Sequence, residues 1–347
     1  MKILSVIAIV LFILSSCKPT PKGEGILLES ISQSDKQWTG IAISKEGRIF
    51  VNYPNWSSNV PVSVAEIING IPRSYPNMTW NQRRDTLSFH SIQSVFIDKL
   101  DRLWILDTNN PQFSGVIKQG PMLYQFNLEA DTLVDAFSFD QSFYQTQSYF
   151  NDVRIDTDKN VAYLTDSGDG AIIVLDLNTR ESRRLLDNHS STQSEEDHLF
   201  CDGIKWKNTV HSDGIALSPD NTYLYYTALT GHTLYRIKTE HLLNKTLNKK
   251  ELEQKVEKVM KIPATDGMLF DHEGNLYLGG LEDNSINRIN KDGVLEKFIQ
   301  NPQIRWPDSF AKDVDANIYF TTSQIHLPQN KREQYEVIRF NPEPTNN

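Results

Sequence analysis

Apolar and polar residues alternate in short runs along most of this chain, and one polar phrase returns between the runs. The phrase begins with a small or acidic residue, continues with two or three polar residues and ends in an apolar pair. Its six copies are Ser44–Phe50, Asp98–Trp104, Asp156–Tyr163, Ser218–Tyr225, Asp271–Tyr277 and Asp313–Tyr319. An alternation that enters a tight turn and leaves it again is typical of a β-hairpin. The pattern therefore predicts the same hairpin six times.

The spacing of the copies predicts the architecture. Successive copies start 54, 58, 62, 53 and 42 residues apart, with strand-like patterns between them. Repeats of this length suit propeller blades of four strands each. We therefore predict an all-β fold, a six-bladed β-propeller. Pairing of Glu336–Phe340 with Ile26–Ile31 would close the ring and leave no free sheet edge.

Three segments depart from the strand rhythm. Asp187–Thr209 is polar and is expected to form a loop at the rim. Glu240–Lys261 carries spaced leucines and valines among many charges, which allows a short amphipathic helix or a long charged hairpin at the outer edge. Tyr53–Asn81 is rich in proline and aromatic residues and is expected to be an aromatic loop region rather than regular sheet.

The amino-terminal residues predict export. Residues 1–16 combine Lys2 with an apolar run that is too short to span a bilayer, which is typical of a signal peptide. Leu14–Cys17 resembles the cleavage box of bacterial lipoproteins, in which the cysteine is lipidated. A polar tether, residues 17–25, precedes a single domain at residues 26–347. We therefore expect an exported lipoprotein anchored through Cys17, facing the periplasm or the cell surface.

Composition excludes two classes. The formal net charge is −9 and no dense basic block occurs, so nucleic acid is not an expected partner. Besides Cys17 the only cysteine is Cys201, so an intramolecular disulfide is not available to the domain. The domain must therefore depend on packing and ring closure for its stability.

The hairpin phrase also locates candidate chemistry, because the innermost strands of a propeller all start at one face of the channel. The residues five positions before each phrase are all polar: Thr39, Gln93, Asn151, Asp213, Asp266 and Asp308. We call these six residues the ring. Asp152 adds a carboxylate next to it.

Two interpretations of the ring stay open. Asp before Gly is a common turn device, which would make these residues structural. Carboxylates aimed into one channel would instead raise one another's pKa values and need a bound hard cation, a bound organic cation or a proton. Oxygen ligands from Asn and Asp suit Ca²⁺ or another hard divalent cation rather than zinc. No organic cofactor is expected.

Several stretches resemble the yellow / major royal jelly protein family over nearly the whole domain. They are Arg48–Pro54, Val60–Val64, Tyr75–Trp80, Ser94–Thr108, Phe150–Val153, Tyr163–Gly168, Ser212–Pro219 and Trp306–Phe310. The resemblance implies a six-bladed propeller. It also implies a protein that binds small amines or sterols, or, in some insect members, one that converts dopachrome.

A more remote resemblance concerns catalysis. Asp266–Gly280 is similar to the corresponding stretch of the senescence-marker-protein/gluconolactonase (SMP-30) family, whose members hold a divalent metal at the channel mouth. This resemblance implies metal ligands at Asn151, Asp213 and Asp266, with Asp266 also acting on water. The family's glutamate ligand falls at Thr39, where the acidic group is missing.

Three functions follow as alternatives. The first is a divalent-cation-dependent hydrolase of lactones or esters, with Asn151, Asp213 and Asp266 as ligands and Asp266 as the catalytic residue. The second is a non-catalytic binding protein for a small amine or aromatic ligand, with Thr39, Gln93, Asp152 and Asp308 contributing to the site. The third is a scaffold for protein partners. The sequence does not decide between an enzyme and a binding protein, nor does it predict an oligomeric state.

Overall fold

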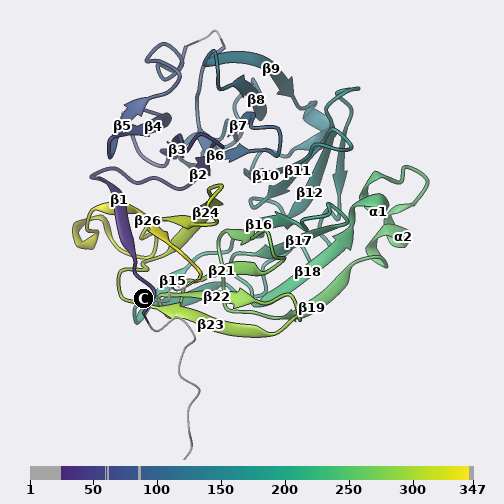
Figure 1. The fold of residues 1–347 in the computed structure, drawn as a ribbon. Coiled ribbons are helices and arrows are strands. Elements are labelled where there is room, and N and C mark those ends of the chain that lie inside the picture. Colours follow the sequence, from purple (N-terminus) through teal and green to yellow (C-terminus); the bar gives the residue numbers. More distant parts are fainter. Residues whose placement is uncertain (1–24, 59, 61, 85–86, 344–347) are drawn as a thin grey trace, which may run out of the picture.

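The computed structural model describes residues 25–343 except 59, 61, 85 and 86. The described residues form six four-stranded antiparallel sheets arranged around a central channel (Figure 1). This is the six-bladed β-propeller that the hairpin spacing predicts. Cys17 and the expected signal peptide lie outside the described residues, so export and lipidation stay predictions. No helix in the described part of the chain has the length and apolarity that crossing a bilayer requires.

The first three blades follow one another along the chain, and each runs from an innermost to an outermost strand. Blade 1 contains β2 (Ile41–Ile43), β3 (Ile49–Asn52), β4 (Val64–Ile68) and β5 (Ile71–Ser74). Blade 2 contains β6 (Ile92–Ile97), β7 (Leu103–Asp107), β8 (Met122–Asn127) and β9 (Thr132–Ser138). Blade 3 contains β10 (Phe150–Asp156), β11 (Val161–Asp166), β12 (Ala171–Asp176) and β13 (Ser182–Leu185).

The last three blades complete the propeller, and the sixth takes its outer strand from the start of the domain. Blade 4 contains β16 (Ser212–Leu217), β17 (Tyr223–Ala228), β18 (Thr233–Lys238) and β19 (Glu257–Lys261). Blade 5 contains β20 (Met268–Phe270), β21 (Leu276–Gly280), β22 (Ser285–Ile289) and β23 (Leu295–Gln300). Blade 6 contains β24 (Pro307–Lys312), β25 (Ile318–Thr322), β26 (Tyr335–Phe340) and β1 (Glu29–Ser34).

The remaining elements are short. A hairpin of β14 (His198–Cys201) and β15 (Ile204–Lys207) lies in the expected rim loop. The helices α1 (Thr239–Leu243) and α2 (Lys249–Glu253) lie at the outer edge of the propeller (Figure 1). Three single-turn 3-10 helices, η1 (Pro111–Phe113), η2 (Gln141–Phe143) and η3 (Gln329–Lys331), sit in loops. The Glu240–Lys261 segment thus contains two short helices followed by an outer strand, rather than one element.

One expectation about blade 1 was wrong. The Tyr53–Asn81 segment is not only an aromatic loop, because β4 and β5 lie inside it. Its prolines are compatible with sheet: Pro72 lies on β5, an edge strand on which a missing N–H is tolerated. The segment's first part, from Tyr53, is the loop.

The recurring phrase forms a turn in which the side chain of the first residue accepts hydrogen bonds from backbone N–H groups of the residues that follow it. Oδ1 of Asp98 accepts from the N–H groups of Leu100 and Arg102 at 2.9 and 3.1 Å. Asp271 and Asp313 repeat this arrangement two and four residues ahead of themselves. Because a short polar side chain at this position substitutes for a backbone acceptor, the phrase specifies the turn locally.

Apolar side chains fill the spaces between neighbouring blades. β7 is buried along its whole length: Trp104 and Leu106 pack toward blade 3, whereas Leu103 and Ile105 pack toward blade 1. Similar clusters lie between every other pair of adjacent blades among the described residues. The strands therefore carry apolar residues on both faces, as expected of stacked sheets.

Two Asp-Gly pairs show how closely the innermost strands approach. A Cβ on Gly267 would lie 2.3 Å from the carbonyl oxygen of Asp308, and one on Gly214 would lie 2.2 Å from that of Asp266. Gly267 N–H also donates to the Asp308 carbonyl at 2.6 Å. Glycine is thus required here by the neighbouring blade, and not by a left-handed turn.

We expect Gly267→Ala to reduce the free energy of unfolding by about 1–3 kcal/mol, because the added methyl displaces backbone of the next blade. Urea titration followed by intrinsic fluorescence measures this. Glu273→Ala is the control: it truncates an exposed side chain in the hairpin turn of the same blade and should change the free energy of unfolding by less than about 0.5 kcal/mol. Equal losses in the two variants would contradict the close-approach explanation.

Candidate functional site

Ring residues lie where the innermost strands depart from regular pairing. The ladder of β10 with β11 shifts register between Phe150 and Val153, which places Asn151 in a bulge. The ladders of β6, β16 and β24 shift in the same way around Gln93, Asp213 and Asp308. A β-bulge turns a side chain out of the alternation of its strand. The bulges therefore direct these polar side chains to the channel mouth.

A cavity of about 420 Å³ opens at this mouth. Five ring residues line it: Gln93, Asn151, Asp213, Asp266 and Asp308. They come from blades 2 to 6, so residues up to 215 positions apart in sequence meet at one site. Five of the six ring residues thus share one cavity, whichever role they have.

The other two candidates point elsewhere. Thr39 is buried beside the cavity, but its hydroxyl accepts from the Asn52 amide at 2.9 Å and does not line the cavity. Oδ1 of Asp152 accepts from the Ser94 hydroxyl at 2.7 Å and lies 2.8 Å from Arg154 Nη1. Thr39 is therefore part of the joint between blades, and Asp152 belongs to an ion pair further along the channel.

The three carboxyl groups at the cavity floor are nearly inaccessible to solvent. Asp213 and Asp308 are 4% exposed and Asp266 is 8% exposed. Burial raises the pKa of Asp213 well above its ordinary value, and the charges of Asp308 and Asp152 raise it further. Burial likewise raises the pKa of Asp266, with added repulsion from Asp308 and Asp213. Burial raises the pKa of Asp308 to about 7. The group therefore retains protons near neutral pH.

A tryptophan orients one member of this group. The indole N–H of Trp306 donates to Oδ2 of Asp266 at 2.8 Å. Trp306 is fully buried, packs against Trp206 of β15 with ring centroids 4.9 Å apart, and immediately precedes the strand that carries Asp308. The sequence pattern did not reveal its bond to Asp266.

Aromatic side chains form one wall of the cavity. Phe113 of η1 stacks on Tyr149 with centroids 4.9 Å apart, and Trp56 stacks on Phe113 with centroids 5.9 Å apart. The Trp56 indole donates to the Tyr149 hydroxyl at 2.7 Å, and that hydroxyl donates to Oε1 of Gln93 at 2.8 Å. We call Trp56, Phe113 and Tyr149 the aromatic wall. It is linked by hydrogen bonds to the ring.

Of the aromatic wall, the sequence pattern pointed only to the loop that holds Trp56. Tyr149 was missed, although it lies two residues before Asn151, at the entrance of the same strand. Phe113 was missed because it lies in a loop without periodicity. On the opposite side, Trp206 of the rim hairpin lines the cavity, so the polar Asp187–Thr209 segment does reach the mouth.

The side chains at the cavity floor are potential ligands for a metal ion. Oxygen donors alone suit a hard cation. Among the described residues, however, no group of three or more His, Cys, Asp or Glu side chains is placed to hold a metal ion. One oxygen of Asp266 is also engaged by Trp306, and Thr39 faces away. As placed here, the residues do not form a ready metal site.

The fold and the site define a class: a six-bladed β-propeller with a deep cavity at one channel mouth, acidic at its floor and aromatic along one wall. Residues 90–341 match the family model "Major royal jelly protein". The chain belongs to the major royal jelly protein family, as the sequence resemblance indicated.

Curated relatives agree with this assignment. The chain is 24% identical to major royal jelly protein 6 of Apis mellifera over 261 residues, which cover 71% of this chain and 58% of the bee protein. It is 25% identical to major royal jelly protein 3 of the same species, over 70% of this chain and 46% of that protein. The match thus spans about half the length of these relatives.

Solved structures agree with the fold. A gluconolactonase from Xanthomonas campestris superposes with a TM-score of 0.57 at 11% identity, covering 91% of this chain and 89% of that one. Regucalcin, a calcium-binding protein from Agrobacterium tumefaciens, gives a TM-score of 0.56 at 12% identity, with 91% and 95% coverage. At such identities the likeness concerns the propeller alone.

Proposed function

We propose that this protein binds a small organic cation with an aromatic body, such as an arylalkylamine, in the cavity at the ring. The observation that carries the proposal is the combination of buried carboxyl groups with an aromatic wall. A cavity of about 420 Å³ falls in the size range of small-molecule sites. Asp213 and Asp308 would receive the ammonium group, and the aromatic wall would receive the body and add cation–π attraction.

Charge supports this choice of ligand. The carboxyl groups hold protons because burial and mutual repulsion disfavour their ionised forms. An ammonium group placed among them would offset that repulsion and lower their pKa values. Binding should therefore release protons at neutral pH and should strengthen as the pH rises through about 7, where Asp308 ionises.

Calorimetric titration with tryptamine tests the proposal. We expect Asp213→Asn to weaken binding about 10-fold and the Asp213→Asn/Asp308→Asn pair about 100-fold, since a charge-assisted contact contributes roughly 1.5–3 kcal/mol. Titration in buffers of different ionisation enthalpy should show proton release. Asp35→Asn, which removes an exposed carboxylate at the same mouth, should change the affinity less than about 2-fold. Unchanged binding in the double variant would refute the proposal.

A second candidate is the cation-dependent lactone or ester hydrolase. It is supported by the convergence of Asn151, Asp213 and Asp266 in one cavity and by a fold shared with a gluconolactonase. A carboxyl group accepts a proton from water only in its ionised form, and burial among other carboxyl groups disfavours that form in Asp266. A bound cation that stabilised the ionised form would favour its action on water. Metal analysis after dialysis against Ca²⁺, together with lactone turnover by wild type and Asp266→Ala, would identify this activity.

A further inference from the structure

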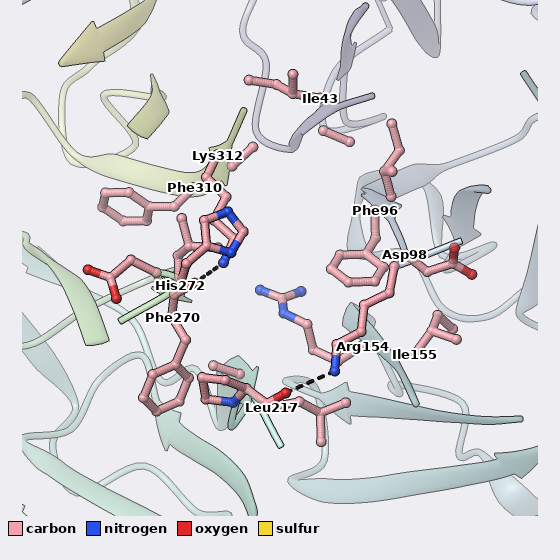
Figure 2. Close-up of a pocket in the computed structure, with 18 of the residues that line it drawn as sticks. Ile43, Phe96, Asp98, Arg154, Ile155, Leu217, Phe270, His272, Phe310 and Lys312 are labelled. Carbon is pink, nitrogen blue, oxygen red and sulfur yellow. Dashed lines mark hydrogen bonds between the residues drawn. The ribbon is translucent and has the colours of Figure 1, made fainter. Parts of the chain in front are cut away.

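A second cavity of about 460 Å³ lies at the opposite channel mouth. Every blade contributes at least one apolar residue of its innermost strand to the lining, among them Ile43, Phe96, Ile155, Leu217, Phe270 and Phe310. We call these six residues the collar. Figure 2 shows them around a central space into which the Arg154 guanidinium projects. The collar offers a ligand an apolar surface on all sides.

Of the four cationic side chains that line this cavity, two lie on the innermost strands that carry the collar: Arg154 and Lys312. The guanidinium of Arg154 lies 5.2 Å from the ring centre of Phe96 and is paired with Asp152 deeper in the channel. The Lys312 ammonium donates to the carbonyl oxygen of Phe270 at 2.9 Å, and no carboxylate among the described residues forms an ion pair with it. Burial lowers the pKa of Lys312 to about 8. A lysine has three donors, so a further acceptor can bind it.

Among the described residues, no acidic side chain at this mouth forms an ion pair with Lys312, although the charge of Asp271 offsets part of the effect of burial on the pKa of the lysine. Both oxygens of Asp98 bond within its own turn and to Arg102 and Trp104. Asp271 accepts from its own turn and from the Asn275 side chain. Asp313 does the same with Asn317 and Tyr319. The turn chemistry that defines each hairpin thus holds these carboxylates within their own turns, and none of them pairs directly with the Lys312 ammonium.

We propose that this second cavity binds a small organic anion with an apolar body, its carboxylate on Lys312 and Arg154 and its body against the collar. Each part of the ligand then meets a matching surface. A carboxylate is the acceptor that ammonium and guanidinium groups bind most strongly, and the three phenylalanines suit an aromatic or alkyl body. The two mouths of the channel would then select ligands of opposite charge.

Titration with 3-phenylpropionate, beside its uncharged amide, tests the proposal. We expect the carboxylate to bind at least 10-fold more tightly than the amide. Lys312→Met should weaken carboxylate binding about 10-fold, whereas Lys312→Arg should retain most of it. Lys255→Met, which removes an exposed lysine at the outer edge of blade 4, is the matched control and should leave the affinity unchanged.

Asp213→Asn distinguishes the two mouths, because that carboxyl lines only the first cavity. Anion binding should persist in this variant. Equal affinities for the carboxylate and its amide would overturn the proposal. So would unchanged binding in Lys312→Met, or loss of anion binding in Asp213→Asn. Circular dichroism of each variant separates loss of binding from loss of fold.

Discussion

Replacing Asp308 by asparagine is expected to make the ligand-free protein more stable at pH 8. The ordinary pKa of this carboxyl is 3.8 and burial raises it to about 7 in the folded state. Folding therefore favours the protonated form, and the wild type loses stability as the pH rises from about 4 to about 7. Asparagine stays neutral throughout, so the variant should gain roughly 2–4 kcal/mol at pH 8 and nothing below pH 4.

Urea unfolding across this pH range, after dialysis against a chelator, measures the effect. Asp220→Asn is the control of opposite sign. Hydrogen bonds from Ser218 and Thr222 lower the pKa of Asp220 to about 2. Its contribution to stability is therefore present at neutral pH and is lost only as the pH falls toward 2, so this variant should be less stable at pH 8. If Asp308→Asn were no more stable than wild type at pH 8, burial would not raise the pKa of this carboxyl.

Asp166→Ala is expected to cause the largest loss of stability of the substitutions considered. Asp166 is fully buried and accepts from the Ser148 hydroxyl at 2.6 Å, the Tyr149 N–H at 2.8 Å and Arg184 Nη1 at 2.7 Å. Removing Asp166 leaves the buried Arg184 with only the more exposed Asp187 as a charged partner and leaves the Ser148 and Tyr149 donors without their acceptor, so we expect a cost of about 3–5 kcal/mol. Since Tyr149 also loses its backbone anchor, amine binding by the folded fraction should weaken as well.

The matched comparison is Asp135→Ala, which breaks the surface pair with Arg180 at 2.7 Å. Exposed pairs contribute roughly 0–1 kcal/mol, so this variant should be nearly as stable as wild type. Urea titrations of both variants, with tryptamine titrations below the unfolding transition, provide the two measurements. Similar losses of unfolding free energy in Asp135→Ala and Asp166→Ala would show that the buried pair of Asp166 contributes no more to stability than a surface pair.

The fold was predictable because its signals are local. Each hairpin phrase carries an acceptor that bonds N–H groups within four residues, so neighbouring blades are not needed to define the turn. The blade count follows from repetition. The strands β4 and β5 were not predicted, because the prolines of this segment were interpreted as evidence against regular sheet. The edge strand β5 tolerates its proline.

The site was predictable only in part. Ring positions transfer from blade to blade because all innermost strands start at the same face. Thr39 does not line the cavity. Its hydroxyl is held by the amide of Asn52 on β3 of the same blade, a contact that the spacing of the hairpin phrases does not encode. Tyr149 and Phe113 come from connections whose paths are set by tertiary packing, for example the bond from Tyr149 N–H to Asp166. No period in the sequence encodes such paths.

The closure of blade 6 determines when the molecule can be finished during synthesis. Ser30 of β1 bonds Glu336 of β26 across 306 residues of chain, whereas blades 1 to 5 are each built from consecutive strands. A ribosome has therefore made the strands of five sheets before β26 emerges. Until then β1 lacks the strand with which it pairs in the finished sheet. Contacts of such long sequence separation form late and slowly. The growing chain would present an open strand edge throughout translation, so shielding of β1 by a chaperone would matter most for its yield.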